Sequence, residues 1–340
     1  WAVGMTGGAL VRFVREEVFP FYAEITAESA NDFLRDARLV IDEPVVLKQV
    51  LTLVDELRLD TADSDTKGDL FEHILGQIEQ AGELGQFRTP RHIIRTIVEM
   101  VSPQIGETIY DAAAGTAGFL VGAYNHIRLQ HSSDASIEEV EVDGKTIKRG
   151  LGDKLSKKEH AVLRTQTFYG NDVDGTMVHL ATMNLMLRGL PDVRILKRNA
   201  LTQTMDRDRR AEFDLPLDGY DVILANPPFS GSIDAHRIVD DVRVGNAKKT
   251  EILFIKYMMN ALKQGGRCGV VVPNGIVETE TKSYKELRRQ LLENNTLHAV
   301  MSLPSGVFQP YSNVKTSVLF FSKGGETNQV MFLHIDEDGY

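Results

Sequence analysis

The segment from residue 109 to 120 has the sequence Ile109-Tyr110-Asp111-Ala112-Ala113-Ala114-Gly115-Thr116-Ala117-Gly118-Phe119-Leu120. It predicts a short strand, an acidic residue, a glycine-containing turn and the start of a helix. Gly115 and Gly118 would let backbone amides approach a ligand closely. Asp111 would place a carboxylate beside that ligand, which disfavours a pyrophosphate and suits a group that carries an amine or a positive charge. Neither GxGxxG nor GxxxxGK[ST], the patterns of dinucleotide and P-loop sites, is present.

Short apolar runs alternate with helical patterns from residue 85 onward. The runs predicted as strands are residues 108–110, 167–169, 193–195, 222–224, 269–272, 297–301, 317–321 and 330–335. Strands that alternate with helices imply an α/β fold with a doubly wound, mostly parallel sheet. The polar stretch 131–158, with Asp143-Gly144 as a turn signal, is predicted to be an inserted hairpin or loop.

Before this pattern the chain is predicted to be helical. Apolar residues recur at helical spacing between Ala27 and Gln80, with a break expected over the polar residues 60–68. We therefore predict an α-helical domain over residues 1–84 and a second domain over residues 85–340. Because the chain begins at Trp1 and ends just after a strand-like run, we expect the first domain to lack its start and the second its C-terminal tail.

Composition excludes several classes of protein. Of the 340 residues 42% are hydrophobic, yet no stretch reaches the roughly 18 apolar residues of a membrane span. A secretion signal is also missing from the N-terminal residues, so we expect no membrane contact and a cytoplasmic protein. The single cysteine, Cys268, excludes an internal disulfide and is expected to be buried in a strand. The nine histidines show no ligand spacing, and we predict no metal site.

The net charge of −10 is unevenly distributed. Residues 1–86 contain 17 acidic and 7 basic residues, whereas residues 87–340 contain 31 of each. A chain with this balance is not expected to wrap nucleic acid by itself. The basic run at residues 188–210 could contact phosphates weakly, or it could be a solvated loop.

Polar residues follow the other predicted strands. Asn171-Asp172 ends the second strand, where an acidic group is positioned for a ribose diol. Arg198-Asn199 follows the third strand, and Asn226-Pro227-Pro228-Phe229 follows the fourth. The two prolines restrict φ and remove backbone donors, so hydrogen-bond acceptors beside an aromatic ring are presented to a planar amine. The glycine-led loop at residues 85–90 precedes a helix expected to begin near Arg91. Each segment could be an ordinary loop, but five in this order are not expected by chance.

With these loops in this order, the chain from about Lys67 resembles the S-adenosylmethionine-dependent DNA adenine-N6 methyltransferases. Within them it is similar to the modification subunits of type I restriction-modification systems. The residues that carry the resemblance are 85–90, 111–120, Asp172 within 170–189, Asn226 to Phe229, 265–275 and 303–308. The resemblance implies a Rossmann-like S-adenosylmethionine-dependent methyltransferase fold, preceded by the α-helical domain.

The resemblance also implies the site residues. The catalytic residues would be Asn226, Pro227, Pro228 and Phe229. S-adenosylmethionine would be bound by Phe87, Arg88, Thr89, Pro90, Asp111, Ala113, Gly115, Thr116, Gly118, Phe119, Asp172, Asn199 and Asn226. Three residues depart from the family's pattern: Ala112 replaces a proline, Ala117 a glycine, and Asn199 stands where an acidic residue is frequent. If residue 117 needs a positive φ, alanine there costs roughly 1 kcal/mol.

The implied activity is methyl transfer to N6 of an adenine that is flipped out of duplex DNA. Only about forty residues separate Phe229 from the next predicted strand, too few for a separate recognition domain, so a specificity subunit is expected to read the DNA sequence. In the family a restriction subunit joins the complex, and we expect two copies of this chain per specificity subunit. Two alternatives stay open, namely a methyltransferase of a protein glutamine or of RNA, and a catalytically silent assembly subunit.

Overall fold

The computed structural model describes residues 4–26, 37–80, 89–142, 145–309 and 313–337. The chain divides into two compact units, residues 1–83 with 182–192 and residues 84–181 with 193–340. The domain limits derived from the sequence stay a prediction. Across the described ranges, every helix is too short or too polar to cross a membrane.

The first unit is helical. Its elements are α1 Gly8–Phe13, the π-helical turn η1 Val14–Val18, α2 Phe19–Thr26, α3 Pro44–Glu56 and α4 Ser64–Gln80. Leu10, Val14 and Leu47 belong to a small buried core of this unit. The break expected over residues 60–68 is wrong from residue 64 onward. The Asp63 side chain accepts a hydrogen bond from the Thr66 backbone N–H at 2.8 Å, and this cap starts α4 within the polar stretch. The helical pattern expected at residues 27–36 lies outside the described residues.

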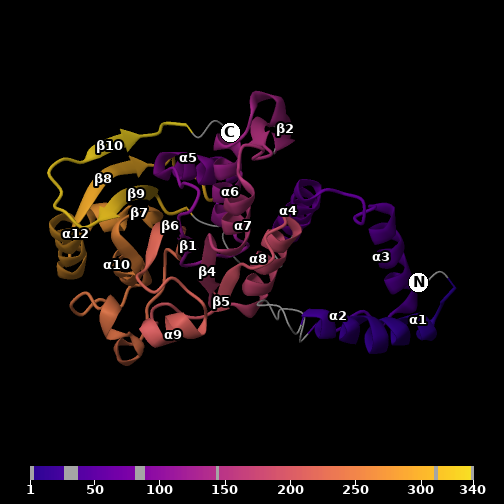
Figure 1. Ribbon diagram of the computed structural model, residues 1–340. Coiled ribbons are helices and arrows are strands. Elements are labelled where there is room, and N and C mark those ends of the chain that lie inside the picture. The colour runs from indigo at the N-terminus through magenta and orange to yellow at the C-terminus, as the bar shows by residue number, and fades with distance from the viewer. Residues whose placement is uncertain (1–3, 27–36, 81–88, 143–144, 310–312, 338–340) are drawn as a thin grey trace. The chain divides into compact units, whose positions relative to one another are not determined.

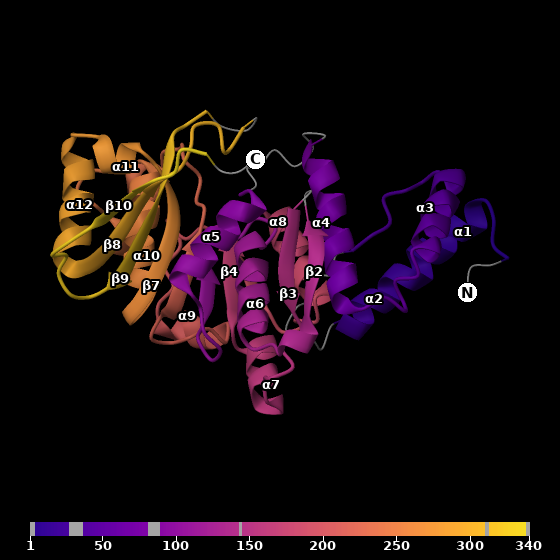
Figure 2. The same ribbon diagram turned by 90° about the horizontal axis from the view of Figure 1, so that it is seen from above.

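The second unit is built on an eight-stranded sheet with the order β10-β8-β9-β7-β6-β1-β4-β5 (Figures 1 and 2). Its strands are β1 Ile109–Asp111, β4 Phe168–Asp172, β5 Arg194–Lys197, β6 Tyr220–Ala225, β7 Leu262–Pro273, β8 Asn295–Ser302, β9 Thr316–Lys323 and β10 Met331–His334. Only β9 runs antiparallel to its neighbours, β7 and β8; the other pairs are parallel. Each predicted strand overlaps one of these, and the predicted fold class is confirmed.

Helices connect the strands of this sheet. They are α5 Arg91–Val101, α6 Gly118–Gln130, α7 Lys157–Thr165, α8 Gly175–Leu187, α9 Arg207–Glu212, α10 Thr250–Ala261, α11 Gly275–Glu278 and α12 Lys282–Asn294, with 3₁₀ turns η2 Asp134–Ser136, η3 Ala235–Arg237 and η4 Asp240–Val242. The last residues of α8, from Thr182, belong to the first unit. An antiparallel hairpin, β2 Ile137–Val142 with β3 Lys145–Gly150, confirms the predicted insertion. Its expected turn, Asp143-Gly144, lies outside the described residues.

Successive residues of β7 show that helices cover both faces of the sheet. Gly269 faces α5, because a Cβ there would lie 2.8 Å from the Ile97 side chain. Cys268 and Val270 point the opposite way, into the core that they share with residues of α10. Cys268 is 1% exposed, which confirms that it is a buried packing residue.

The strand order reverses between β1 and β6. From β1 the chain continues to β4 and β5 on one side, and β6 then pairs with β1 on the other side. In open α/β sheets, ligands bind at the carboxyl ends of the strands where the order reverses. With about 4.8 Å between neighbouring strands, the ends of β6, β1, β4 and β5 span roughly 15 Å. The polar residues that follow these strands therefore lie within reach of one small molecule.

Candidate active site

Asp172, at the end of β4, holds the glycine turn that follows β1. Its two carboxylate oxygens accept hydrogen bonds from the backbone N–H groups of Gly115 and Asp174, both at 3.0 Å. Gly115 has φ 51°, a left-handed conformation that glycine adopts without strain. The turn is therefore fixed from the neighbouring strand. A carboxylate has about four lone-pair positions, so Asp172 can still accept from a ligand's hydroxyl groups.

Asp111 is a buried carboxyl group next to this turn. Its side chain is only 2% exposed, and it accepts a hydrogen bond from the backbone N–H of Ala113 at 3.0 Å. Burial raises the pKa of Asp111 to about 7; the hydrogen bond from Ala113 opposes this shift, and the nearby charge of Asp172 adds to it. Within the described ranges, no cationic side chain forms an ion pair with Asp111. The site therefore favours a ligand that brings a positive charge.

Asn226, directly after β6, presents a free acceptor. Its Nδ2 donates a hydrogen bond to the hydroxyl of Thr89 at 2.9 Å. Its Oδ1 is buried and accepts no hydrogen bond from the part of the chain that the structure describes. Buried acceptors are rarely left unsatisfied, so this oxygen is a candidate contact for the N–H of a ligand. Thr89 and Pro90 precede α5, which begins at Arg91 as predicted.

The residues after Asn226 differ in exposure. Pro227 is buried and Pro228 is exposed. Phe229 is 9% exposed and packs edge-to-face with Phe308, with ring centroids 5.4 Å apart and an interplanar angle of 81°. Phe308 thus holds the aromatic ring of this segment in place.

Asn171 links the end of β4 to two loops, and it is not among the site residues predicted from the sequence. Its Nδ2 donates to the backbone carbonyls of Ala112 at 3.1 Å and Arg198 at 3.2 Å. Its Oδ1 accepts from the hydroxyl of Tyr110. These bonds tie the end of β4 to the segments that follow β1 and β5. The available signal was an amide directly before Asp172, at the end of a strand that begins with two aromatic residues.

The other predicted residues occupy varied places. Asn199 uses its Oδ1 to accept from the backbone N–H of Leu201 at 3.0 Å, which closes a local turn. Gly118 is the first residue of α6, and Phe119, which follows it, is 4% exposed. Thr116 lies in the turn before them. Phe87 and Arg88 lie outside the described residues.

The basic run at residues 188–210 is only partly available to phosphates. Arg188 is 1% exposed and forms ion pairs with Asp69 at 3.1 Å and Glu72 at 3.2 Å. Arg198 is 8% exposed and donates to the Tyr257 hydroxyl at 3.0 Å. The prediction that this run is available to phosphates is therefore wrong for these two arginines, because both are buried and bonded to other side chains. Lys197, Arg207 and Arg209 are exposed.

Ala117 lies in the turn with φ 67°, so the condition for backbone strain is met. Ala117→Gly should stabilise the protein by about 1 kcal/mol, because glycine adopts positive φ without the clash of a Cβ. In thermal unfolding this corresponds to a rise of about 2–4 °C. Ala114→Gly is the matched control: Ala114 is buried in the same turn without a positive φ, and this change should lower the melting temperature. Equal destabilisation by both changes would show that residue 117 is unstrained.

Comparisons with known proteins identify the family of this chain. Residues 62–340 match the family model described as N-6 DNA Methylase. The EcoEI type I restriction enzyme methylase subunit of Escherichia coli is 31% identical over 345 residues, which cover 98% of this chain and 64% of that protein. The chain thus spans less than two thirds of the length of this relative.

Solved structures show the same relationship. One chain from a study of complex assembly and conformational transition in the type I R-M system aligns with a TM-score of 0.75 and 29% identity, covering 99% of this chain and 64% of that one. A Listeria monocytogenes structure assigned to the class I S-adenosylmethionine-dependent methyltransferases aligns with a TM-score of 0.60, covering 97% of this chain and 90% of that one. At 16% identity, the second likeness concerns the fold alone. The sheet and its helices thus have the fold of S-adenosylmethionine-dependent methyltransferases.

Proposed function

Because this chain belongs to the N-6 DNA methylase family, we propose that it transfers a methyl group from S-adenosylmethionine to N6 of an adenine in duplex DNA. The observation that carries the proposal is the amide of Asn226. It stands at the carboxyl end of β6, beside the reversal of strand order, and its buried Oδ1 has no protein partner among the described residues.

The donor set fits the cofactor. S-adenosylmethionine carries an amino group, a ribose diol and a sulfonium whose methyl group is electrophilic. Asp111 is a buried carboxyl without a cationic partner in the described ranges, and it suits the amino group. Asp172 suits the diol, and the turn that it holds brings the backbone at Gly115 close to the ligand. The other proposed cofactor residues are Phe87, Arg88, Thr89, Pro90, Ala113, Thr116, Gly118, Phe119, Asn199 and Asn226.

Asn226 and Pro227 would activate the adenine amine. Its lone pair is delocalised into the ring, which makes it a poor nucleophile. Two acceptors, Asn226 Oδ1 and the carbonyl of Pro227, would each bind one N6 hydrogen and favour the tetrahedral nitrogen of the transition state over the planar ground state. The new N–CH3 bond would form as the S–CH3 bond breaks, which leaves the cofactor as a neutral thioether. No strong general base is needed, because the nitrogen is positively charged after methyl transfer and then releases its proton readily to water.

The adenine must leave the base stack to reach this site, at a cost of a few kcal/mol. Phe229 would stack on the flipped base, which contributes about 1–3 kcal/mol. Phe308 supports this role because it holds the Phe229 ring from one side. Pro228 restricts the residue before it, Pro227, to extended backbone conformations.

A partner would select the DNA sequence. Between β6 and α10, residues 226–249 are all described, and they contain two single-turn 3₁₀ helices, η3 and η4. Such a segment is too small for a recognition domain. We propose a specificity subunit as the partner, two copies of this chain per specificity subunit, and a restriction subunit in the full complex. The relatives are named as methylase subunits of type I restriction enzymes, which supports the view that this chain works within a complex.

The test is methyl transfer from labelled S-adenosylmethionine to duplex DNA, with and without the specificity subunit. With it, the label should appear as N6-methyladenine at defined sites. Label in protein or RNA instead would favour the alternative methyltransferases, because a glutamine amide fits the same pair of acceptors. No transfer to any of these substrates, despite cofactor binding, would favour a silent assembly subunit.

The isolated chain should bind duplex DNA weakly and without sequence preference. Exposed cations such as Lys248, Lys249 and Arg207 can contact phosphates, and such binding falls steeply with salt because it depends on counterion release. Titrations at several salt concentrations measure this. Tight, site-selective binding by the isolated chain at physiological salt would show that it encodes recognition itself.

A further inference from the structure

Thr89 contacts the proposed catalytic amide and not only the loop in which it lies. Its hydroxyl is the acceptor for Asn226 Nδ2, 2.9 Å away, across 137 residues of sequence. We propose that Thr89 is a positioning residue that holds the Asn226 amide with its Oδ1 toward the substrate amine. This inference rests on the proposed function, since it names a residue that the same reaction requires.

The orientation of the Asn226 side-chain amide determines whether a hydrogen-bond donor or an acceptor faces the substrate. One end of an amide carries two donors and the other end an acceptor. An incoming amine also presents N–H donors, so only the Oδ1 end can bind it. If the amide turned over, its two N–H groups would face the amine and no hydrogen bond could form.

Thr89 fixes the place of the amide by bonding its Nδ2 end. Because a hydroxyl can also donate to an amide oxygen, the choice between the two orientations is completed by the incoming amine, which can bind only Oδ1. Among the described residues, its hydroxyl is the only acceptor that bonds to Asn226 Nδ2. Thr89 is 7% exposed, so water has little access to replace it. Without this hydroxyl, Nδ2 would be a buried donor without a partner among the described residues, which is unfavourable and would release the amide from its position.

Helix α5, which follows Thr89, packs closely against α6 and the sheet. A Cβ on Gly122 of α6 would lie 2.7 Å from Ile94 of α5, and one on Gly269 of β7 would lie 2.7 Å from Val101. Both glycines therefore permit α5 to pack closely against α6 and the sheet. The start of α5, where Thr89 lies, takes its position from this packing.

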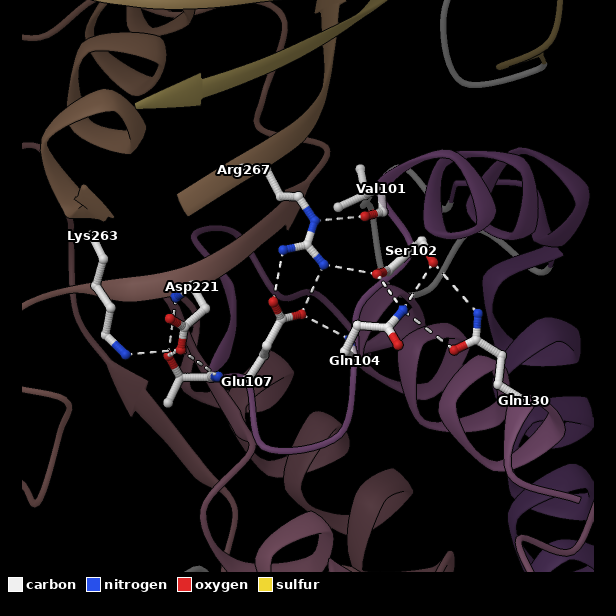
Figure 3. A network of polar contacts seen from close by, with 9 residues as sticks. Val101, Ser102, Gln104, Glu107, Gln130, Asp221, Lys263 and Arg267 are labelled. Carbon is white, nitrogen blue, oxygen red and sulfur yellow. Dashed lines mark hydrogen bonds and ion pairs between the residues drawn. The ribbon is translucent and has the colours of Figure 1, made fainter. Parts of the chain in front are cut away.

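The other end of α5 is clamped to the sheet (Figure 3). The guanidinium of Arg267, on β7, donates to the carbonyls of Val101 and Ser102, both at 2.7 Å. It also forms a two-bond ion pair with Glu107, at 2.7 and 2.8 Å. Gln104 donates to the carbonyl of Ser102 at 2.9 Å. A helix fixed along its length and at its C-terminal end can hold Thr89 at a constant distance from Asn226.

The experiment compares Thr89→Val with two other variants in the complex with the specificity subunit. Thr89→Val keeps the shape of the side chain and removes the hydroxyl, so kcat should fall roughly tenfold, the effect of one hydrogen bond. The affinity for S-adenosylmethionine, measured by calorimetry, should change less than kcat. Thr89→Ser keeps the hydroxyl and should recover most of the lost kcat.

Thr96→Val is the matched control. Thr96 is an exposed residue of the same helix, and its hydroxyl donates to the carbonyl of His92 at 2.9 Å. The same chemical change there should leave kcat unaltered. Cofactor binding by Thr89→Val would show that the variant is folded.

Three outcomes would overturn the positioning role: an unchanged kcat in Thr89→Val, a loss confined to cofactor affinity, or a loss in Thr89→Ser as large as that in Thr89→Val. Failure of the proposed function gives a different result, because the unaltered complex would then show no transfer to adenine at all.

Discussion

Asn226→Ala should remove nearly all methyl transfer and leave S-adenosylmethionine binding close to that of the unaltered protein. The Oδ1 acceptor acts on the amine as the transition state forms, and removing one such preorganised group typically costs 10²–10³-fold in kcat. Single-turnover transfer and calorimetry on the same preparation measure the two quantities. Asn260→Ala is a suitable control, because Asn260 is an exposed amide of α10 that bonds to the carbonyl of Asp241.

Asp172→Ala should have the reverse effect. Asp172 holds the turn at Gly115 and is proposed to bind the ribose diol, so cofactor affinity should fall first. At saturating cofactor, much of the activity should return. An equal loss of cofactor affinity in Asn226→Ala and Asp172→Ala would contradict the separate roles of the two residues.

Cofactor affinity should depend on pH through Asp111. Its raised pKa of about 7 means that below pH 7 the carboxyl is mostly protonated and cannot attract a positive amino group. Affinity should therefore rise as pH increases toward 7, approaching a tenfold change per pH unit on the acidic side. A free α-amino group stays mostly charged below about pH 7.7, so titration of the cofactor itself does not cause the expected change in affinity below pH 7. The Asp111→Asn variant should bind S-adenosylmethionine weakly at every pH in this range, and its affinity should not change with pH.

The same group should make the cofactor-free protein less stable as pH rises. In the unfolded chain the pKa of Asp111 is near 3.8, so between about pH 4 and 7 the folded state binds the additional proton. The free energy of unfolding therefore decreases across this window, by up to about 4 kcal/mol from this group. At pH 8 the cofactor-free Asp111→Asn variant should melt at a higher temperature than the unaltered protein. A lower melting temperature of the variant at that pH would show that the ionised carboxylate of Asp111 does not destabilise the folded protein.

Local patterns in the sequence were sufficient to predict most of the helices and strands and the fold class. Strand-like runs that alternate with helical segments predicted the doubly wound sheet, because each element must bury an apolar face against another. The glycine turn after residue 111 and the two prolines after Asn226 predicted where strands end, since these residues restrict the backbone locally. The start of α5 at Arg91 and the inserted hairpin followed from local signals as well.

Contacts between distant residues depend on the tertiary structure. The order of the strands places Asn226 beside the start of α5, and only then does the hydroxyl of Thr89 reach its amide. The links of Asn171 to two loops and the burial of Arg188 and Arg198 likewise arise from packing, which no local pattern encodes. From the sequence, Ala117 was expected to be strained only if its φ were positive. The structure shows that the φ of Ala117 is positive. Residue types and spacing therefore determined the elements and the chemistry available at their ends, whereas the pairing of strands decided which of those groups meet.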